Sequence, residues 1–278
     1  MSRVFRALEK AEKEKQEKLK KDISPVLVGE ASLAKKEEVA PRWEARPTYE
    51  MPKRPEISSI LMSPPDSFSE EQFRKLKTQI FHWSTSHPHT ILVTSTNPNE
   101  GKTMVSVNLA TAIAQEMQKK AILVLADLRK PGVPLSGYQN TKGLSNYLTD
   151  GIPISEIMIH GEGGKLSVIP PGPPSGRSSE LIGSDRMKEL IISLRALGED
   201  TYIIIDSPPI LSTAEPTVLS KLAEGVILVV MADRTSRESV QRAVKLIDRD
   251  KIIGVVLNQV DLKLPGYYSK YHYGNSKR

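Results

Sequence analysis

Three adjacent residues, Gly101, Lys102 and Thr103, are the strongest candidates for chemistry in this sequence. They follow an apolar run, ILVTS, and precede a helical pattern in which Val105 and Leu109 share one face. At such a turn, backbone N–H groups and the start of the helix bind phosphate oxygens, the lysine neutralises their charge and the threonine hydroxyl ligates Mg²⁺. The tripeptide alone is a weak signal. Its position between strand and helix predicts a nucleotide site that holds ATP with Mg²⁺.

The phosphate-binding turn departs from the usual glycine-rich pattern at two positions, Thr96 and Asn99. Asparagine tolerates left-handed backbone angles better than other non-glycine residues. We therefore expect the loop to form, at some cost in nucleotide affinity.

Acidic residues close two further apolar runs. Asp206 ends YIIID, where a carboxylate can hold Mg²⁺ or position a nucleophile, although aspartate at a strand end is also a common turn former. Asp127 and Arg129 follow AILVLA at alternate positions, so we expect their side chains to enter the same crevice above the strand tips. The alternative for this pair is a helix cap and a solvated arginine. Beside the phosphate loop, the two carboxylates predict one composite site.

Apolar, β-rich runs alternate with helical patterns through the second part of the chain. The runs begin at Ile91, Ala121, Leu166, Tyr202, Gly225 and Ile252. Near-continuous apolar strands separated by helices are typical of a parallel sheet covered on both faces. We therefore predict a doubly wound α/β fold with a mostly parallel sheet, preceded by a helix over residues 70–82.

The chain divides into four predicted segments. Residues 1–30 form a charged helix that either frays or docks on a partner, and residues 31–65 a proline-rich linker whose composition cannot offset the entropy of ordering. Residues 66–262 hold the α/β domain, and residues 263–278 form a tyrosine-rich tail. Because neighbouring and alternate tyrosines cannot share one face, we interpret the tail as a flexible phosphate acceptor rather than a sticky terminus. Its tyrosines are Tyr267, Tyr268, Tyr271 and Tyr273.

Composition excludes several classes of protein. The 278 residues include no cysteine, which rules out disulfide scaffolds and thiol chemistry, and the five histidines show no paired ligand spacing. No apolar stretch approaches the roughly 18 residues of a membrane-spanning helix, and the first residues lack the apolar core of a secretion signal. A net charge of +6, interspersed with acid, does not favour nucleic acid as a partner. We therefore expect a cytoplasmic protein.

Taken together, the motifs T-S-x-x-P-x-E-G-K-T, A-D-L-R-K-P, I-I-I-D-S-P-P and G-V-V-L-N and the tyrosine-rich tail resemble those of the cytoplasmic kinase domain of bacterial tyrosine kinases. That domain is related in fold to the deviant-Walker P-loop ATPases that position division septa. The opening MSRVFRALEKAEKEK resembles more narrowly the soluble autokinases of exosortase and exopolysaccharide gene clusters. The resemblance covers the chain from Glu70 onward. It implies ATP-dependent tyrosine autophosphorylation that regulates polymerisation or export of a surface polysaccharide.

The resemblance also implies roles for individual residues. It assigns nucleotide binding to Ser95, Asn97, Pro98, Asn99, Glu100, Gly101, Lys102, Thr103 and Met104, with Asn258 against the adenine. It assigns Mg²⁺ to Thr103, Asp127 and Asp206, and catalysis to Lys102, Asp127, Asp206 and Arg129. It assigns phosphate acceptance to the tyrosines of the tail.

Assembly and activation are implied in the same way. The segment SEEQFRKLKTQI is similar to the helix through which family members form rings, with Glu71 and Arg74 in place and Lys77 where a second arginine is usual. Lysine at that position lacks the bidentate fork of arginine. The implied activator is a membrane-bound polysaccharide co-polymerase, or chain-length determinant, which would hold this protein at the inner membrane.

One departure from the resemblance bears on the chemistry. Family members usually carry aspartate where this chain has Leu125, and that aspartate is thought to act on Mg²⁺ and the incoming tyrosine hydroxyl. We favour an autokinase, and Leu125 supports the alternative of a nucleotide-dependent regulatory switch with little kinase activity. A partitioning or septum-type ATPase that assembles on DNA or membrane is disfavoured by the tyrosine tail and by the lack of a lysine early in the loop.

Overall fold

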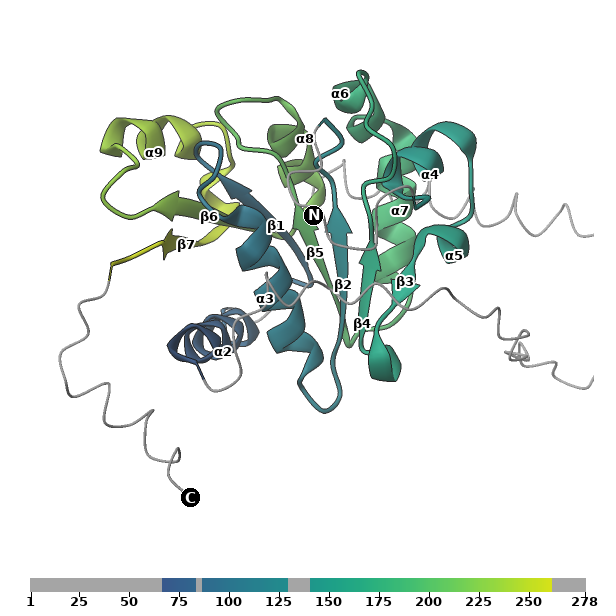
Figure 1. Ribbon diagram of the computed structural model, residues 1–278, viewed down its shortest axis with the longest axis horizontal. Helices are drawn as coiled ribbons and strands as arrows, with labels where there is room; N and C mark the ends of the chain where they lie inside the picture. The colour runs from purple at the N-terminus through teal and green to yellow at the C-terminus, as the bar shows by residue number, and fades with distance from the viewer. Residues whose placement is uncertain (1–66, 84–86, 130–140, 262–278) are drawn as a thin grey trace, which may run out of the picture. The chain divides into compact units, whose positions relative to one another are not determined.

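The computed structural model describes residues 67–83, 87–129 and 141–261 (Figure 1). The predicted N-terminal helix and linker, residues 1–65, and the tyrosine-rich residues 263–278 lie outside the described residues. The segment boundaries proposed for them therefore stay predictions.

A seven-stranded sheet forms the centre of the described chain, in the order β3-β4-β2-β5-β1-β6-β7. Neighbouring strands pair in parallel except β3, which pairs antiparallel with β4. The strands are β1 (Thr90–Ser95), β2 (Lys120–Leu125), β3 (Ile159–His160), β4 (Leu166–Ile169), β5 (Thr201–Asp206), β6 (Gly225–Met231) and β7 (Ile252–Asn258). The predicted mostly parallel sheet is confirmed, and each predicted run corresponds to one of these strands. The two-residue β3 was not predicted.

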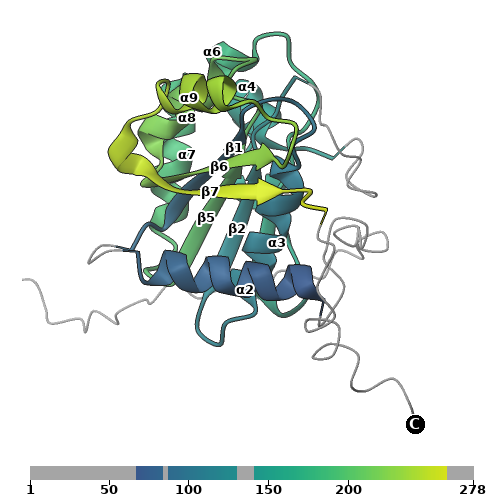
Figure 2. The same cartoon turned by 90° about the vertical axis from the view of Figure 1, so that its left-hand side faces the viewer.

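Helices cover both faces of the sheet, as the doubly wound prediction requires (Figures 1 and 2). One face packs against α2 (Phe68–Phe81) and α3 (Lys102–Ala114). The other packs against α4 (Leu144–Asp150), α5 (Ile154–Ile157), α6 (Ser178–Ile182), α7 (Asp185–Arg195), α8 (Glu215–Leu222) and α9 (Arg237–Val244). Burial on both faces explains why the central strands β1 and β5 lack polar alternation.

The helix α3 is more deeply buried than its one predicted apolar face requires. Val107 and Ala110 are fully buried in addition to Val105 and Leu109, because α2 packs against α3 on the same face of the sheet and shares its apolar cluster. The helix α2 starts two residues before the predicted Glu70, since the hydroxyl of Ser67 accepts a hydrogen bond from the Glu70 N–H and caps it.

The strand order determines which strand tips meet. Because β5 lies between β1 and β2, Asp206 is level with Val93 on one side and with Leu125 on the other. The phosphate loop follows β1, and Asp127 follows β2. The carboxyl edge of these three strands therefore gathers the residues that the sequence predicted for one composite site. Within the ranges given above, no helix is long and apolar enough to cross a membrane.

Candidate active site

Two contacts join the phosphate loop to the predicted carboxylates. The Thr103 hydroxyl donates a hydrogen bond to Asp206 Oδ2 at 2.7 Å. The Lys102 ammonium lies 3.7 Å from Asp127 Oδ2. These four side chains come from three different strand ends, so the fold assembles the composite site that the sequence predicted.

Asp206 is the buried carboxylate of this site, with 3% of the residue exposed. Its second oxygen accepts a hydrogen bond from the Ser106 hydroxyl at 3.3 Å, one helical turn beyond Thr103. Burial raises the pKa of Asp206 to about 6, against the opposing effect of the Lys102 charge. Because carboxylate and hydroxyl oxygens are the ligands that Mg²⁺ prefers, the Thr103 and Asp206 pair fits this ion.

The backbone of the phosphate loop uses the left-handed conformation at two positions. Asn99 has φ 64°, as its expected tolerance allows, and Gly101 has φ 89°. A Cβ on Gly101 would lie 2.1 Å from the amide nitrogen of Asn258, so both the angle and the space require glycine there.

Glu100 is a buried carboxylate inside the loop that is predicted to bind phosphates, so its negative charge there needs an explanation. Its side chain accepts hydrogen bonds from the backbone N–H of Asn97 at 2.9 Å and from the Thr235 hydroxyl at 2.5 Å. Glu100 thus folds the loop back on itself and ties it to the segment that follows β6. The side chain of Glu100 therefore supports the loop, and its contact with the nucleotide stays a prediction.

The end of β7 holds the loop from the other side. The Asn258 side-chain amide donates to the Glu100 carbonyl at 2.8 Å, and the Gln259 amide donates to the Asn99 carbonyl at 3.1 Å. Asn258, predicted to contact adenine, therefore also supports the phosphate loop. The remaining predicted nucleotide residues Ser95, Pro98 and Met104 lie at the strand end, in the turn and in the first turn of α3.

On the β2 side of the site, Arg129 is bound to other side chains and Leu125 is buried. The Arg129 guanidinium bonds to Glu215 at 2.8 Å and to Ser179 at 3.0 Å. Leu125, level with Asp206, is 7% exposed and belongs to the apolar cluster under α3. Leu125 therefore packs and cannot bind a metal, at the position where the family resemblance implies an aspartate.

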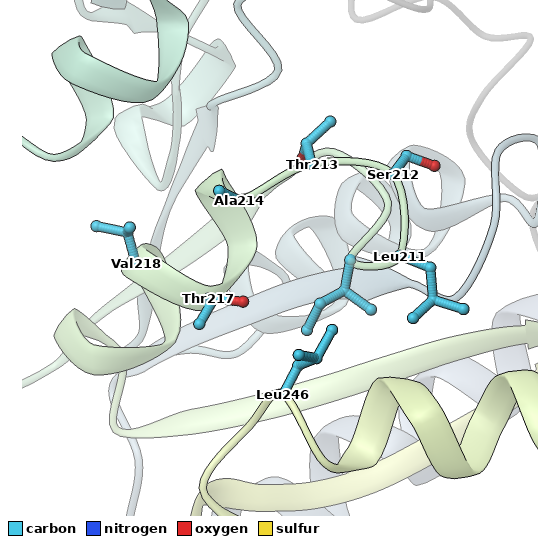
Figure 3. A pocket seen from close by; sticks show the side chains of 8 residues that line it. Leu211, Ser212, Thr213, Ala214, Thr217, Val218 and Leu246 are labelled. Carbon is cyan, nitrogen blue, oxygen red and sulfur yellow. The ribbon is translucent and has the colours of Figure 1, made fainter.

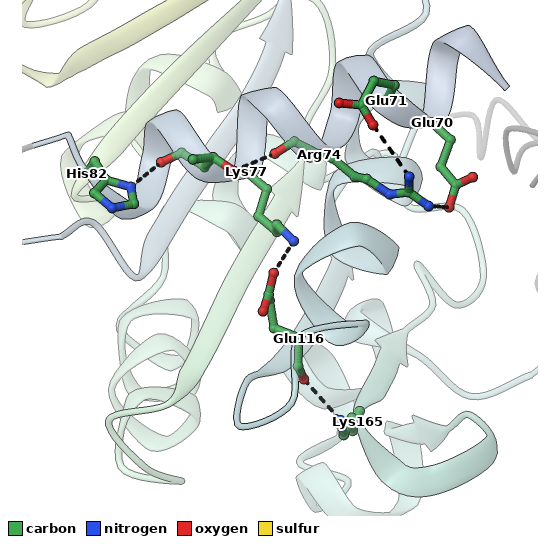
Figure 4. A network of polar contacts seen from close by, with 8 residues as sticks. Glu70, Glu71, Arg74, Lys77, His82, Glu116 and Lys165 are labelled. Atoms are coloured by element: carbon green, nitrogen blue, oxygen red, sulfur yellow. Dashed lines mark hydrogen bonds and ion pairs between the residues drawn. The ribbon is translucent and has the colours of Figure 1, made fainter. Parts of the chain in front are cut away.

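The exposed face of α2 carries the predicted assembly residues (Figure 4). Arg74 pairs within its own helix, at 3.0 Å with Glu70 and at 3.4 Å with Glu71. Lys77 turns inward instead and forms an ion pair with Glu116, just beyond the end of α3. The second basic position of the predicted assembly motif thus ties α2 to α3 within this chain.

An apolar pocket of about 530 Å³ lies beside the loop between β5 and α8 (Figure 3). Its lining residues are Ile210, Leu211, Ser212, Thr213, Ala214, Thr217, Val218 and Leu246. The backbone N–H of Ile210 donates to the Ser95 carbonyl at 2.8 Å, so the pocket adjoins the start of the phosphate loop. Since no charged side chain lines it, the pocket does not suit a triphosphate, and we place the nucleotide at the loop.

Sequence reasoning missed several residues that shape this site. Ser106 could have been found from its position one helical turn after Thr103. Thr235, Gln259 and Glu215 belong to no motif with a known chemical spacing, and only the fold brings them beside the loop or Arg129.

Comparison with known proteins gives tyrosine-protein kinases among the relatives of this chain. The tyrosine-protein kinase YwqD of Bacillus subtilis is 32% identical over 216 residues, which cover 76% of this chain and 90% of that protein. The solved chimeric protein CapA2B2 superposes with a TM-score of 0.64 at 30% identity, over 71% of this chain and 88% of its own.

A more distant likeness concerns the fold alone. A chain of the MinC:MinD cell division complex of Aquifex aeolicus superposes with a TM-score of 0.51 at 21% identity, over 62% of this chain and 69% of its own. No family model matches the sequence.

Proposed function

The chain belongs to the family of bacterial tyrosine-protein kinases, and on that premise we propose that it is an ATP-dependent tyrosine autokinase that regulates polymerisation or export of an exopolysaccharide. The observation that supports this most directly is the contact of Thr103 with buried Asp206 beneath the phosphate loop, with Lys102 beside Asp127. A lysine, a hydroxyl and two carboxylates gathered at one edge of the sheet can position a phosphoryl group and neutralise its charge during transfer.

Each residue has a proposed role in the transfer. The loop N–H groups and Lys102 would hold the β and γ phosphates, and Thr103 and Asp206 would hold Mg²⁺, which would supply neutralising charge. Asp127 accepts the proton of a tyrosine hydroxyl as that oxygen bonds to the γ phosphorus. The bond from the γ phosphorus to ADP then breaks, leaving phosphotyrosine.

The proposed acceptors are the tail tyrosines of a neighbouring copy: Tyr267, Tyr268, Tyr271 and Tyr273. Two other tyrosines suit this role poorly, since Tyr147 and Tyr202 are buried in the two apolar clusters. A hydroxyl must reach the γ phosphate in line, which a tail can do and a core residue cannot.

Two partners follow from this proposal. A second copy of the chain binds through the face of α2 that carries Glu71 and Arg74. A membrane-bound polysaccharide co-polymerase activates the kinase and holds it at the cytoplasmic face of the inner membrane. Nucleic acid is not among the proposed partners.

The second candidate function is a nucleotide-dependent regulatory ATPase of the same export system with little kinase activity. Leu125 favours it, because an apolar side chain is level with Asp206 where the family usually has a carboxylate. Both functions share the nucleotide site and differ in whether tyrosine is the acceptor.

Phosphotyrosine formation by the purified full chain with Mg-ATP tests the proposal, with and without the cytoplasmic segment of the co-polymerase. We expect weak phosphorylation that the segment stimulates. A variant truncated before Gly266 should bind nucleotide as the full chain does and lose most of the phosphate. Phosphate mapped mainly to Tyr138, Tyr147 or Tyr202 would contradict the proposed acceptors, and ADP without phosphotyrosine would favour the regulatory ATPase.

A further inference from the structure

Glu215 is a buried carboxylate that none of the roles above uses. It is the first residue of α8, and 1% of its side chain is exposed. Its Oε1 atom accepts hydrogen bonds from Arg129 Nε at 2.8 Å, from the Ser178 hydroxyl at 2.7 Å and from the Ser179 hydroxyl at 3.0 Å. One oxygen therefore gathers three donors from two other segments of the chain.

The charge of Glu215 is secured by these contacts. Burial alone would raise the pKa of Glu215, but the hydrogen bonds from Ser178 and Arg129 outweigh burial and lower that pKa to about 2. The position at the start of a helix also favours a negative charge. Glu215 is thus a carboxylate at neutral pH and can hold a cation in place.

The cation that Glu215 holds is the Arg129 guanidinium, which is fixed at two points. While Glu215 accepts from Arg129 Nε, the Ser179 hydroxyl accepts from Arg129 Nη2 at 3.0 Å, which sets the plane of the guanidinium. Half of the Arg129 side chain stays exposed, and no contact within the described part of the chain engages Nη1. The guanidinium therefore keeps donors for an anionic ligand.

These residues lie at the edge of the sheet where the proposed chemistry takes place. Arg129 is two residues beyond Asp127, and Glu215 follows the loop that begins at Asp206. Ser178 and Ser179 follow β4, whose carboxyl end is on the same side because β4 is parallel to β2. A fixed guanidinium at this edge can stabilise negative charge at no cost of reorganisation.

We infer that Glu215, together with Ser178 and Ser179, is a positioning residue that fixes the Arg129 guanidinium against the phosphoryl group in transfer. The inference rests on the proposed function. It differs from a structural tie between loops in one measurable way. A positioning residue affects the rate of transfer more than nucleotide affinity or stability.

The decisive variant is Glu215→Gln, which keeps the size of the side chain and removes its charge. Single-turnover phosphotyrosine formation and ADP formation are measured at saturating Mg-ATP. We expect the rate to fall about tenfold, with the KM for ATP within about twofold of the wild type, because a misplaced group costs mainly transition-state stabilisation. The matched control is Glu156→Gln, which removes an exposed glutamate paired with Lys142 and should keep the wild-type rate.

A second pair of variants tests the connection to Arg129. Arg129→Lys keeps the charge and loses the two-point contact, so its rate should fall to a similar extent and the double variant with Glu215→Gln should be no slower than either single one. If Glu215→Gln does not fold, Ser179→Ala removes one hydroxyl and should slow transfer about threefold with an unchanged Tm.

Three results with the variants would overturn the inference. They are a wild-type rate in Glu215→Gln, losses that multiply in the double variant, and a fall in rate matched by a fall in Tm and a rise in the KM for ATP. If the wild type forms ADP but no phosphotyrosine, the proposed function fails, and ADP formation by the same variants still decides the role of Glu215. A wild type that forms neither product would overturn both.

Discussion

The two halves of the nucleotide site are built differently. The phosphate loop is held from outside by Thr235, Asn258 and Gln259, which reach it from the ends of β6 and β7. On the side of β2, Leu125 is buried in the apolar cluster at a position where the family resemblance implies an aspartate. The loop is thus supported by contacts from other segments of the chain, while the β2 side has an apolar side chain beside Asp206. This difference predicts strong nucleotide binding relative to a slow transfer step.

The largest effect is expected from Lys102→Met. This variant removes the positive charge that faces the β and γ phosphates, and we expect Mg-ATP turnover to fall at least about a hundredfold. Turnover is measured as ADP formation, with Lys142→Met as the control because its ammonium pairs with Glu156 on the surface. Wild-type affinity and turnover in Lys102→Met would show that the loop is not the nucleotide site.

Gly101→Ala tests whether the loop is preassembled. The added Cβ would lie 2.1 Å from the Asn258 amide nitrogen and would sit at φ 89°, so either the loop or its support must move. Strain of this kind costs about 2 kcal/mol, and we expect the Kd of Mg-ATP to rise roughly thirtyfold in calorimetry. Gly254→Ala is the matched control, because nothing lies within 4 Å of a Cβ there. Equal affinities would mean that the loop adapts freely.

Leu125→Asp tests the β2 side of the nucleotide site, where transfer is expected to be slow. A carboxylate level with Asp206 would add a ligand for Mg²⁺ or a base for the tyrosine, and we expect single-turnover phosphorylation to rise roughly tenfold with little change in ATP affinity. Leu125→Asn, polar but uncharged, should not show the gain. A rate that stays the same or falls would mean either that Asp127 already serves as the base or that this protein has given up kinase chemistry.

The smallest expected effect concerns stability. Because burial raises the pKa of Asp206 to about 6 in the folded protein, its charge opposes folding above that pH, and the opposition disappears as the pH falls toward the ordinary value of 3.8. Asp206→Asn should therefore raise the Tm of the ligand-free protein by a few degrees at pH 8 and by nothing near pH 4. The exposed Asp250→Asn serves as the control. A lower Tm at pH 8 would indicate that the bonds from Thr103 and Ser106 outweigh the buried charge.

Much of the fold could be predicted because the central strands are apolar at nearly every position. Runs such as ILVTS and YIIID have few alternatives to a buried parallel strand, and the strand-to-helix turn at Gly101 fixes one connection. The strand β3 could not be predicted, because its two residues, Ile159 and His160, are too few to show the alternation of a strand.

The candidate site, too, could be predicted only in part from the sequence. Lys102, Thr103, Asp127 and Asp206 stand at the ends of recognisable elements, so their convergence follows from topology. The partners of Arg129 and Glu100 could not be predicted. Arg129 bonds to Glu215, 86 residues away, and Glu100 bonds to Thr235, 135 residues away. Whether either side chain meets its partner or solvent depends on packing that no local pattern encodes.

The packing of α2 against α3 has a consequence for where the chain can be truncated without loss of the core. A shortened chain that began at Thr90 would keep every strand of the described sheet, yet it would expose the residues of the apolar cluster against which Phe73 and Ile80 now pack. Apolar surface uncovered in this way promotes aggregation during expression. The helix that carries the proposed assembly residues is therefore also an integral part of the core. We expect substitutions on its inner side to reduce soluble yield, which would obscure any test of the proposed ring.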